Sequence, residues 1–368
     1  MDDALPMPKR QKRAWFGWWI ALLALSFIVT GVTTTWHQWN NQQADLHRYQ
    51  QLMDPAAPDP GVTAAEITPT DKAVKVSVGA YIERIPELSI KGATWTAVLD
   101  LWFRWEGDGP SPGENFVIME GAIESKEKLA EDHTAGRHYE RYRVVARITH
   151  PFSVTSFPYD QQLLSIAVEN GSVDRSRMLF VPDLVSTSVS SRATVPGYRT
   201  VGWKAIEKPH SYKTTRGDPR LPPGMKSTYS QFRLGITLHR DGWGLYFKMF
   251  QALFVAVGIA ILAGFIKPTH VDPRFGLGVG GLFAAVANSY LIGGYVPDTG
   301  EMVLADVING LGILAILVTL IESTVSLHLY DSRGEEELSR RLDHTSLAIM
   351  LLGFIGNNVA LLVAANWP

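Results

Sequence analysis

The chain has 368 residues, of which 46% are hydrophobic, and a formal net charge of −2 at pH 7. This balance offers no basic surface to a nucleic acid, so we expect no nucleic-acid partner. The chain contains no cysteine, which excludes disulfides, thiolate metal sites and cysteine nucleophiles. Its mean hydropathy is close to zero because polar and membrane-like blocks lie end to end.

The amino-terminal residues predict a membrane anchor. A basic stretch within residues 1–14 precedes an apolar run over 15–35, which is long enough to span a bilayer. The basic residues place the start of the chain in the cytoplasm. A cleaved signal peptide is the alternative interpretation. No small-x-small cleavage site follows the run, and Trp36 and Trp39 are typical of interfacial anchors, which favours a retained helix.

Residues 36–72 are polar and predict a connecting segment. The sequence is rich in Gln and predicts a helix as far as Gln51. The proline-rich stretch over 54–61 then breaks any helix and indicates a linker.

Residues 73–241 have the pattern of a β-domain. Val74, Val76 and Val78 alternate with polar residues, as in a strand with one buried face. The segment 94–105 is rich in β-branched and aromatic residues, and apolar residues alternate again over 232–238. Several short strands separated by Gly- and Pro-rich turns predict a β-sandwich.

One turn within this domain carries an unusual motif, Phe157-Pro158-Tyr159-Asp160-Gln161-Gln162. Pro158 fixes its own φ and restricts Phe157 to extended geometry. Asp160 needs a partner, because an unpaired charge on a tight apolar loop is costly. A sandwich corner with a solvated Asp160 is the alternative.

Residues 242–368 predict a four-helix transmembrane domain. The apolar segments run over about 246–266, 275–296, 303–327 and 346–363, each near the ~20 residues that cross a bilayer. The first and third loops between them contain Lys or Arg, whereas the second, 297–301, contains neither. The positive-inside rule therefore places the first and third loops in the cytoplasm, with the β-domain and the end of the chain on the other side.

The motif at 157–162 resembles the Phe-Pro-Phe-Asp-x-Gln core of the signature loop of the pentameric ligand-gated ion channels, the Cys-loop receptors. Tyr159 stands at the second aromatic position. The two cysteines of animal receptors would fall at His150 and Leu164, a loss expected of a bacterial relative.

Further segments resemble the same family. Val-Gly-x-Tyr-Ile at 78–82 and Leu-Trp-Phe-Arg-Trp at 101–105 are similar to the first strands of the receptor domain, and 273–279 is similar to the start of the pore-lining helix. The resemblance covers about 74–368. It implies a β plus α membrane protein in which a periplasmic β-sandwich precedes four transmembrane helices. The extra amino-terminal anchor helix at 15–35 and the linker lie outside the resemblance. The resemblance also implies a homopentamer in the bacterial inner membrane, with the lipid bilayer, permeant ions and an unknown small ligand as partners.

The resemblance assigns signal transmission to residues where the sandwich meets the helices. We expect these to be Phe157, Pro158, Tyr159, Asp160, Gln162, Arg240 and Pro297. Arg240 is the expected partner of Asp160, and a broken pair at a crowded interface would leave an uncompensated charge. In the alternative, both are separate charges that reach lipid headgroups.

The resemblance and the helical spacing from Arg274 together predict the residues that line the pore. These are Asp272, Gly276, Gly280, Phe283, Ala287 and either Tyr290 or Leu291. Phe283 falls where a hydrophobic gate is expected, and a ring of Phe could hold a dewetted barrier. Arg274 and Lys267 lie close enough to offset Asp272, so charge selectivity stays open. Gly276 and Gly280 also fit tight helix packing without conduction.

Ligand binding is predicted around the hairpin that follows Val201. The candidate residues are Trp203, His210, Tyr212, Tyr229 and Arg216. Aromatic residues can hold a cation through cation–π attraction, but the basic residues of this lip favour an anion. These basic residues are Lys204, Lys208, Lys213 and Arg216. An ordinary solvated hairpin is the alternative.

An enzyme and a non-conducting receptor or scaffold are the two alternatives to a channel. The sequence has no nucleophile motif, no His pair at metal-ligand spacing and no Gly-rich phosphate loop, so we expect no enzyme, no cofactor and no metal. A non-conducting, membrane-anchored receptor or scaffold of the same architecture remains the alternative function.

Overall fold

A computed structural model describes residues 8–57, 73–215, 217, 227–298 and 300–366, which divide into two compact units. The sheet unit comprises Ala44–Ser153 and Gln161–Asp241. The helical unit comprises the residues up to Gln43, Val154–Asp160, and those from Gly242 onward. Residues 58–61 of the predicted linker and the candidate ligand residue Arg216 lie outside the described residues.

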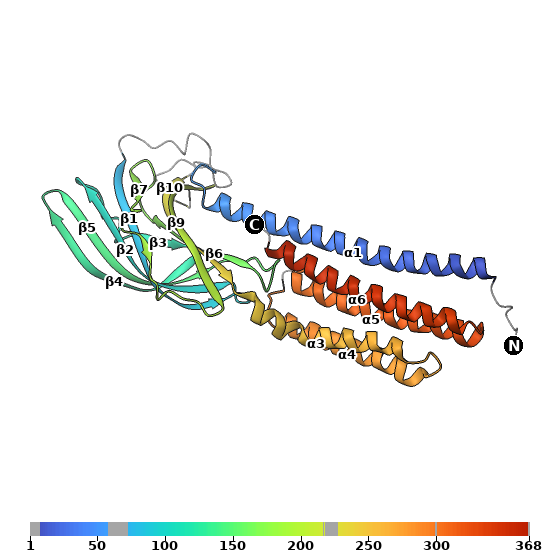
Figure 1. Cartoon of the computed structure of the whole chain (residues 1–368). Helices are drawn as coiled ribbons and strands as arrows, with labels where there is room; N and C mark the ends of the chain where they lie inside the picture. The colour runs from blue at the N-terminus through green and yellow to red at the C-terminus, as the bar shows by residue number, and fades with distance from the viewer. Residues whose placement is uncertain (1–7, 58–72, 216, 218–226, 299, 367–368) are drawn as a thin grey trace. The chain divides into compact units, whose positions relative to one another are not determined.

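The sheet unit contains two β-sheets (Figure 1). The first has the order β4-β5-β2-β1-β7, and β8 pairs with β1; the second has the order β3-β6-β10-β9. The strands are β1 (Val74–Ser89), β2 (Thr94–Glu106), β3 (Phe116–Met119), β4 (Gly121–Thr134), β5 (Arg137–Thr149), β6 (Gln161–Asn170), β7 (Met178–Pro182), β8 (Ser188–Val189), β9 (Tyr198–Tyr212) and β10 (Ser227–Arg240).

One hydrophobic core lies between the sheets. Val76 and Val78 of β1 and the alternating Phe232, Leu234 and Ile236 of β10 belong to it, as their period of two requires. The mixed β plus α fold class is therefore confirmed.

The opposite face of β10 is also largely buried. Residues from 44 onward, at the end of the first helix, belong to the sheet unit and cover this face. Met53 packs with Leu163 and Ile206, and the Arg233 guanidinium donates to the carbonyl oxygen of Leu52 at 3.3 Å. The sequence predicts a helix here as far as Gln51, but it does not predict that this helix packs on the sheet.

Among the described residues, five helices are long and apolar enough to cross a membrane, which fits a membrane protein. They are α1 (Lys9–Leu52), α3 (Gly242–Leu262), α4 (Val271–Gly293), α5 (Leu304–Leu327) and α6 (Glu336–Asn366). A 3-10 turn extends α3, and a π-helical turn extends α5 to Ser332. The run at 15–35 and the polar helix after it thus form one uninterrupted helix.

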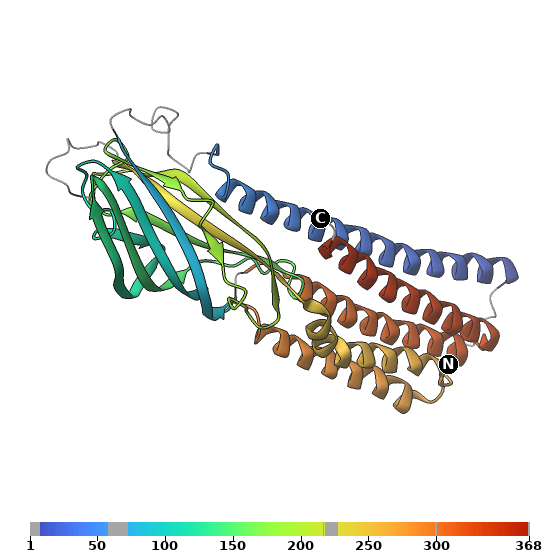
Figure 2. The same ribbon diagram turned by 60° about the vertical axis from the view of Figure 1, so that its left-hand side comes forward.

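In the helical unit, α1 lies alongside α6 (Figure 2). Asn357 Nδ2 donates to the carbonyl oxygen of Phe27 at 3.2 Å, and Trp19 Nε1 donates to Ser346 Oγ at 3.3 Å. A Cβ on Gly353 would lie 2.6 Å from the Phe27 ring, so a larger residue there would push the two helices apart. The anchor helix therefore contacts α6 at Trp19 and Phe27.

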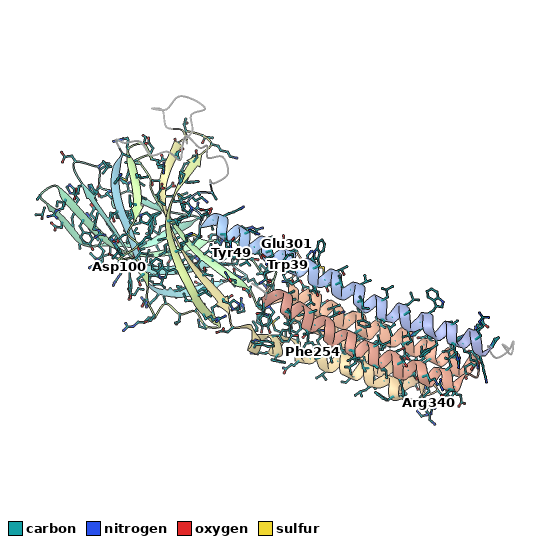
Figure 3. All side chains as sticks on the ribbon, turned by 45° about the horizontal axis from the view of Figure 1, so that its top comes forward. Trp39, Tyr49, Asp100, Phe254, Glu301 and Arg340 are labelled. Atoms are coloured by element: carbon teal, nitrogen blue, oxygen red, sulfur yellow. The ribbon has the colours of Figure 1, made fainter. Side chains whose placement is uncertain are left out.

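The helical unit has two chemically distinct ends. Figure 3 shows Glu301 and Arg340 at opposite ends of it. At the end that holds Arg340, Lys12 forms an ion pair with Glu335. The Arg274 guanidinium at this end donates to the carbonyl oxygen of Ile266 and forms an ion pair with Asp343. The basic start of α1 and the loops at 267–270 and 333–335 therefore gather at one end.

Candidate functional site

A buried carboxylate organises the candidate ligand site. Glu169, near the end of β6, has no exposed surface, and it pairs in register with Gln231 of β10. Its Oε2 lies 3.0 Å from His210 Nδ1, and its Oε1 accepts a hydrogen bond from the Tyr212 hydroxyl. Since β10 lies between β6 and β9, these side chains meet across the middle strand.

Aromatic rings surround this carboxylate. The rings of His210 and Tyr212 have centroids 4.6 Å apart, and Tyr212 meets Tyr229 edge to face at 5.5 Å. Three of the predicted ligand residues, His210, Tyr212 and Tyr229, thus come together. Trp203 does not join them, because it lies seven positions earlier on β9, opposite Ile236.

The sequence does not predict Glu169 as a site residue. An acid at the end of the apolar run Leu163–Val168 is a weak signal by itself, and its importance depends on which strands lie beside it. The analysis also assigned Lys208 to a basic lip. That side chain is buried, and its Nζ donates to the carbonyl oxygen of Gln51 at 2.9 Å, so Lys208 contributes no charge to the lip.

The loop at 154–160 lies among the helices of the helical unit. The Leu304 backbone N–H, at the start of α5, donates to the carbonyl oxygen of Thr155 at 2.8 Å. From α1, Gln38 Nε2 donates to Ser156 Oγ at 2.8 Å, and both side chains are buried. Polar contacts thus tie this loop to two helices that are far apart in the sequence.

Aromatic contacts extend this attachment. Phe157 stacks on Tyr295, which follows α4, with ring centroids 6.5 Å apart. Tyr159 meets Trp243 edge to face at 5.6 Å and packs on Tyr246 of α3 at 5.8 Å.

The start of α3 also fits closely against this loop. A Cβ on Gly242 would lie 2.4 Å from the Pro158 carbonyl oxygen, so only glycine permits this approach. Asp160 is buried here as well.

The other predicted coupling residues have different surroundings. Gln162 and Arg240 belong to the sheet unit, where Gln162 Nε2 donates to the Ser153 carbonyl oxygen at 2.6 Å and Arg240 stacks over the Tyr198 ring at 4.3 Å. Pro297 is half-buried, two residues after Tyr295. The pairing of Asp160 with Arg240 stays a prediction.

The α4 helix has a buried and an exposed face. Its buried residues recur at helical spacing: Arg274, Gly278, Gly281, Ala285, Asn288 and Ile292. The predicted lumen residues Asp272, Gly276, Gly280, Phe283, Ala287 and Tyr290 are all exposed, as is Leu291. Phe283 and Tyr290 are 72% and 80% exposed. Large apolar side chains therefore protrude from this helix on the face away from the bundle.

Arg274 occupies a place that the sequence did not predict. It is fully buried, and its Nη2 lies 2.8 Å from Asp343 of α6 and 3.4 Å from Glu322 of α5. The sequence analysis set Arg274 beside Asp272 as an offsetting charge on the pore. Because two buried carboxylates already surround its guanidinium, Arg274 instead joins α4 to its neighbours.

Comparison with known proteins leaves the chain without a family assignment: neither a scan against models of protein families nor a search of curated proteins found a match.

Proposed function

We propose that this chain is the subunit of a ligand-gated ion channel, a homopentamer whose pore is lined by the exposed face of the helix predicted over 274–296. The observation that carries the proposal is the position of the loop 154–160. The loop contacts α1, α3, α5 and Tyr295 within the helical unit. The strand β6 begins directly after the loop and reaches Glu169.

This strand gives a physical route from ligand to pore. About 27 Å of β-strand separates Gln161 from Glu169. Most of β6 is buried, and it pairs with β10 over Gln161–Glu169 and with β3 over Ala167–Asn170. A ligand that favours one position of Glu169 would shift the loop at the other end of the strand. Such a shift couples two sites only if the ligand binds the two states with different affinity.

We propose that the ligand is a small cation such as an amine. Glu169 supplies a buried negative charge, and the rings of His210, Tyr212 and Tyr229 can surround a cation with their electron-rich faces. This proposal differs from the anionic ligand that the basic residues of the lip predict. The burial of Lys208 away from the lip supports the cation.

The two ends of the helical unit support the orientation that we propose. Lys12, the loop at 267–270 and Arg340 belong to one end, and the loop at 297–301 belongs to the other. By the positive-inside rule, the basic end faces the cytoplasm of a bacterial inner membrane. The β-domain and the carboxyl terminus then lie in the periplasm.

The experiment has two steps. Native mass spectrometry of the detergent-solubilised protein should give a pentamer, and a monomer or dimer would exclude the channel. Planar-bilayer recordings should then show current that depends on amines in a screened panel.

A non-conducting receptor is the second candidate, because Gly276 and Gly280 have open space where a Cβ would be, which suits close packing between copies. A pentamer that stays silent with every amine, and with Phe283→Ala as well, would favour it.

A further inference from the structure

A cluster of potential metal ligands lies on the hairpin formed by β4 and β5, apart from the residues proposed for ligand binding and gating. Glu131 pairs in register with Glu140, and His133 pairs with His138. Because alternate residues of a strand share one face, these four side chains occupy two adjacent rungs on the same side of the hairpin. The arrangement brings two carboxylates and two imidazoles together.

Three of these residues can reach one ion. Glu131, His133 and Glu140 each offer a ligand atom within 4.8 Å of the others, and His133 Nε2 lies 2.9 Å from Glu131 Oε1. Ligands of a tetrahedral Zn²⁺ lie about 3.3–3.6 Å from one another, given metal–ligand bonds of about 2.0–2.2 Å. Glu131 and His133 are exposed, so rotation of their side chains can close the remaining distance.

Glu140 is the fixed member of the cluster. It is fully buried; Ser111 Oγ donates to its Oε1 at 2.6 Å, and the Tyr142 hydroxyl donates to its Oε2 at 3.1 Å. Hydrogen bonds of this kind hold metal-binding carboxylates in place.

His138 orients the imidazole of His133. The two Nδ1 atoms lie 2.7 Å apart, so one ring donates a proton to the other. If His133 is the donor, its Nε2 carries the lone pair that a metal requires, and a hydrogen bond from the second ring nitrogen is the usual support for such a ligand. Trp105 stacks on His138 with centroids 4.9 Å apart, which restricts the supporting ring.

We propose that Glu131, His133 and Glu140 form a Zn²⁺ site, with His138 as a positioning residue. Two carboxylates and a neutral imidazole balance the charge of the ion, and three protein ligands leave a coordination position for water. Lys128 Nζ lies 3.1 Å from Glu131 Oε1, so it competes with the ion for this oxygen. Imidazole distinguishes Zn²⁺ from Ca²⁺, which prefers oxygen ligands alone.

The test is calorimetric titration of the full-length protein in detergent, without a polyhistidine tag and after removal of metals with a chelator. We expect one Zn²⁺ per chain and no binding of Ca²⁺ at the same concentration. His133→Ala should abolish this binding, and Glu131→Gln should weaken it. His138→Ala should weaken it by about 10–100-fold, the usual effect of losing a supporting hydrogen bond.

His47→Ala is the matched control, since His47 is an exposed histidine of α1 and its loss should leave the titration unchanged. The proposal is wrong if the unaltered protein takes up no Zn²⁺, or if His133→Ala binds it as tightly as the unaltered protein. The chosen variants change exposed or half-buried side chains, so size-exclusion profiles should stay unchanged. Neither result depends on whether the protein conducts ions.

Discussion

Phe157 and Tyr295 stack with ring centroids 6.5 Å apart and an interplanar angle of 27°. One ring belongs to the loop that precedes β6, and the other follows the α4 helix. The contact therefore joins the loop directly to the end of the helix proposed to line the pore. The sequence does not predict this pair, because Tyr295 lies near the end of the predicted apolar segment 275–296 and no motif marks it as a partner of the loop.

The first prediction concerns this pair. Phe157→Ala and Tyr295→Ala should each shift the midpoint of the amine response, and a double-mutant cycle should give a coupling energy of about 0.5–1.5 kcal/mol, the usual value for aromatic pairs. Bilayer recordings of the four proteins supply the midpoints. The control cycle joins Phe157→Ala to Leu351→Ala, an exposed residue of α6, and should be additive. Equal coupling in both cycles would show a general loosening of the helical unit.

The second prediction concerns the buried carboxylate. Glu169→Gln keeps the shape of the side chain but removes the negative charge, so amine affinity should fall by about 10–150-fold, the equivalent of ~1.5–3 kcal/mol for a hydrogen bond to a charged group. Radioligand or calorimetric binding measures the change. Trp203→Phe, on the same strand as His210 but away from the cluster, should leave affinity unaltered. If Trp203→Phe lowers amine affinity more than Glu169→Gln does, the amine does not bind at Glu169.

The third prediction is the acid sensitivity of the sheet unit. Burial of Asp183 acts to raise its pKa, but hydrogen bonds from Trp102 Nε1 at 3.1 Å and from Ser186 N, together with Arg104, bring the pKa below its ordinary value of 3.8. A lowered pKa in the folded state means that the carboxylate stabilises the protein above pH 3.8. This contribution is lost as the pH falls through the folded-state pKa.

Asp183→Asn should therefore be less stable than the unaltered protein at pH 7, and the difference should shrink below pH 3.8. Tryptophan fluorescence during heating, repeated over a pH series, measures both. Asp132→Asn is the control, because Asp132 is exposed and its replacement should produce no such trend. A difference that grows on acidification would contradict the assignment.

The fourth prediction concerns the charges inside the helical unit. Arg274→Ala leaves Glu322 and Asp343 buried without their cation, which should cost about 3–5 kcal/mol of stability. Thermal unfolding in detergent should show a large decrease for this variant. Arg340→Ala should show none, since this side chain is 70% exposed. The triple variant Arg274→Met/Glu322→Gln/Asp343→Asn replaces all three ionisable groups and should recover part of the loss; if it does not, packing matters more than charge.

Local periodicity predicted much of the fold. Alternation over 232–238 identifies the core face of β10, because a strand places every second residue on the same side. Apolar runs identify α3 to α6, because the length and composition of a run indicate whether a helix can cross a bilayer. The helical spacing used for α4 also separates Phe283 from the buried stripe that contains Ala285.

What the sequence did not predict depends on neighbours distant in the chain. Glu169 becomes part of a site only when β10 brings it to His210 of β9. Arg274 follows the motif of a pore helix, yet its partners come from α5 and α6. The packing of Met53 on the second sheet likewise cannot be predicted without knowing where the long α1 helix ends. None of these pairings has a periodic signal.

The last prediction is the gate. Phe283 is 72% exposed, and the other predicted lumen positions around it, Gly276, Gly280 and Ala287, are small. In a pentamer with these residues toward the axis, five rings of Phe283 would form an apolar neck, and water leaves such a neck before the side chains close it. Phe283→Ser should wet the neck and produce a leak current in planar bilayers without any amine.

Leu282→Ser is the matched control, because Leu282 is half-buried on the adjacent position of α4. Its replacement should lower expression and thermal stability through lost packing, without a leak. A leak from Leu282→Ser and none from Phe283→Ser would mean that the exposed face of α4 packs against a neighbouring copy. The residues proposed to line the pore would then be wrong as a group, since all of them share the face of Phe283.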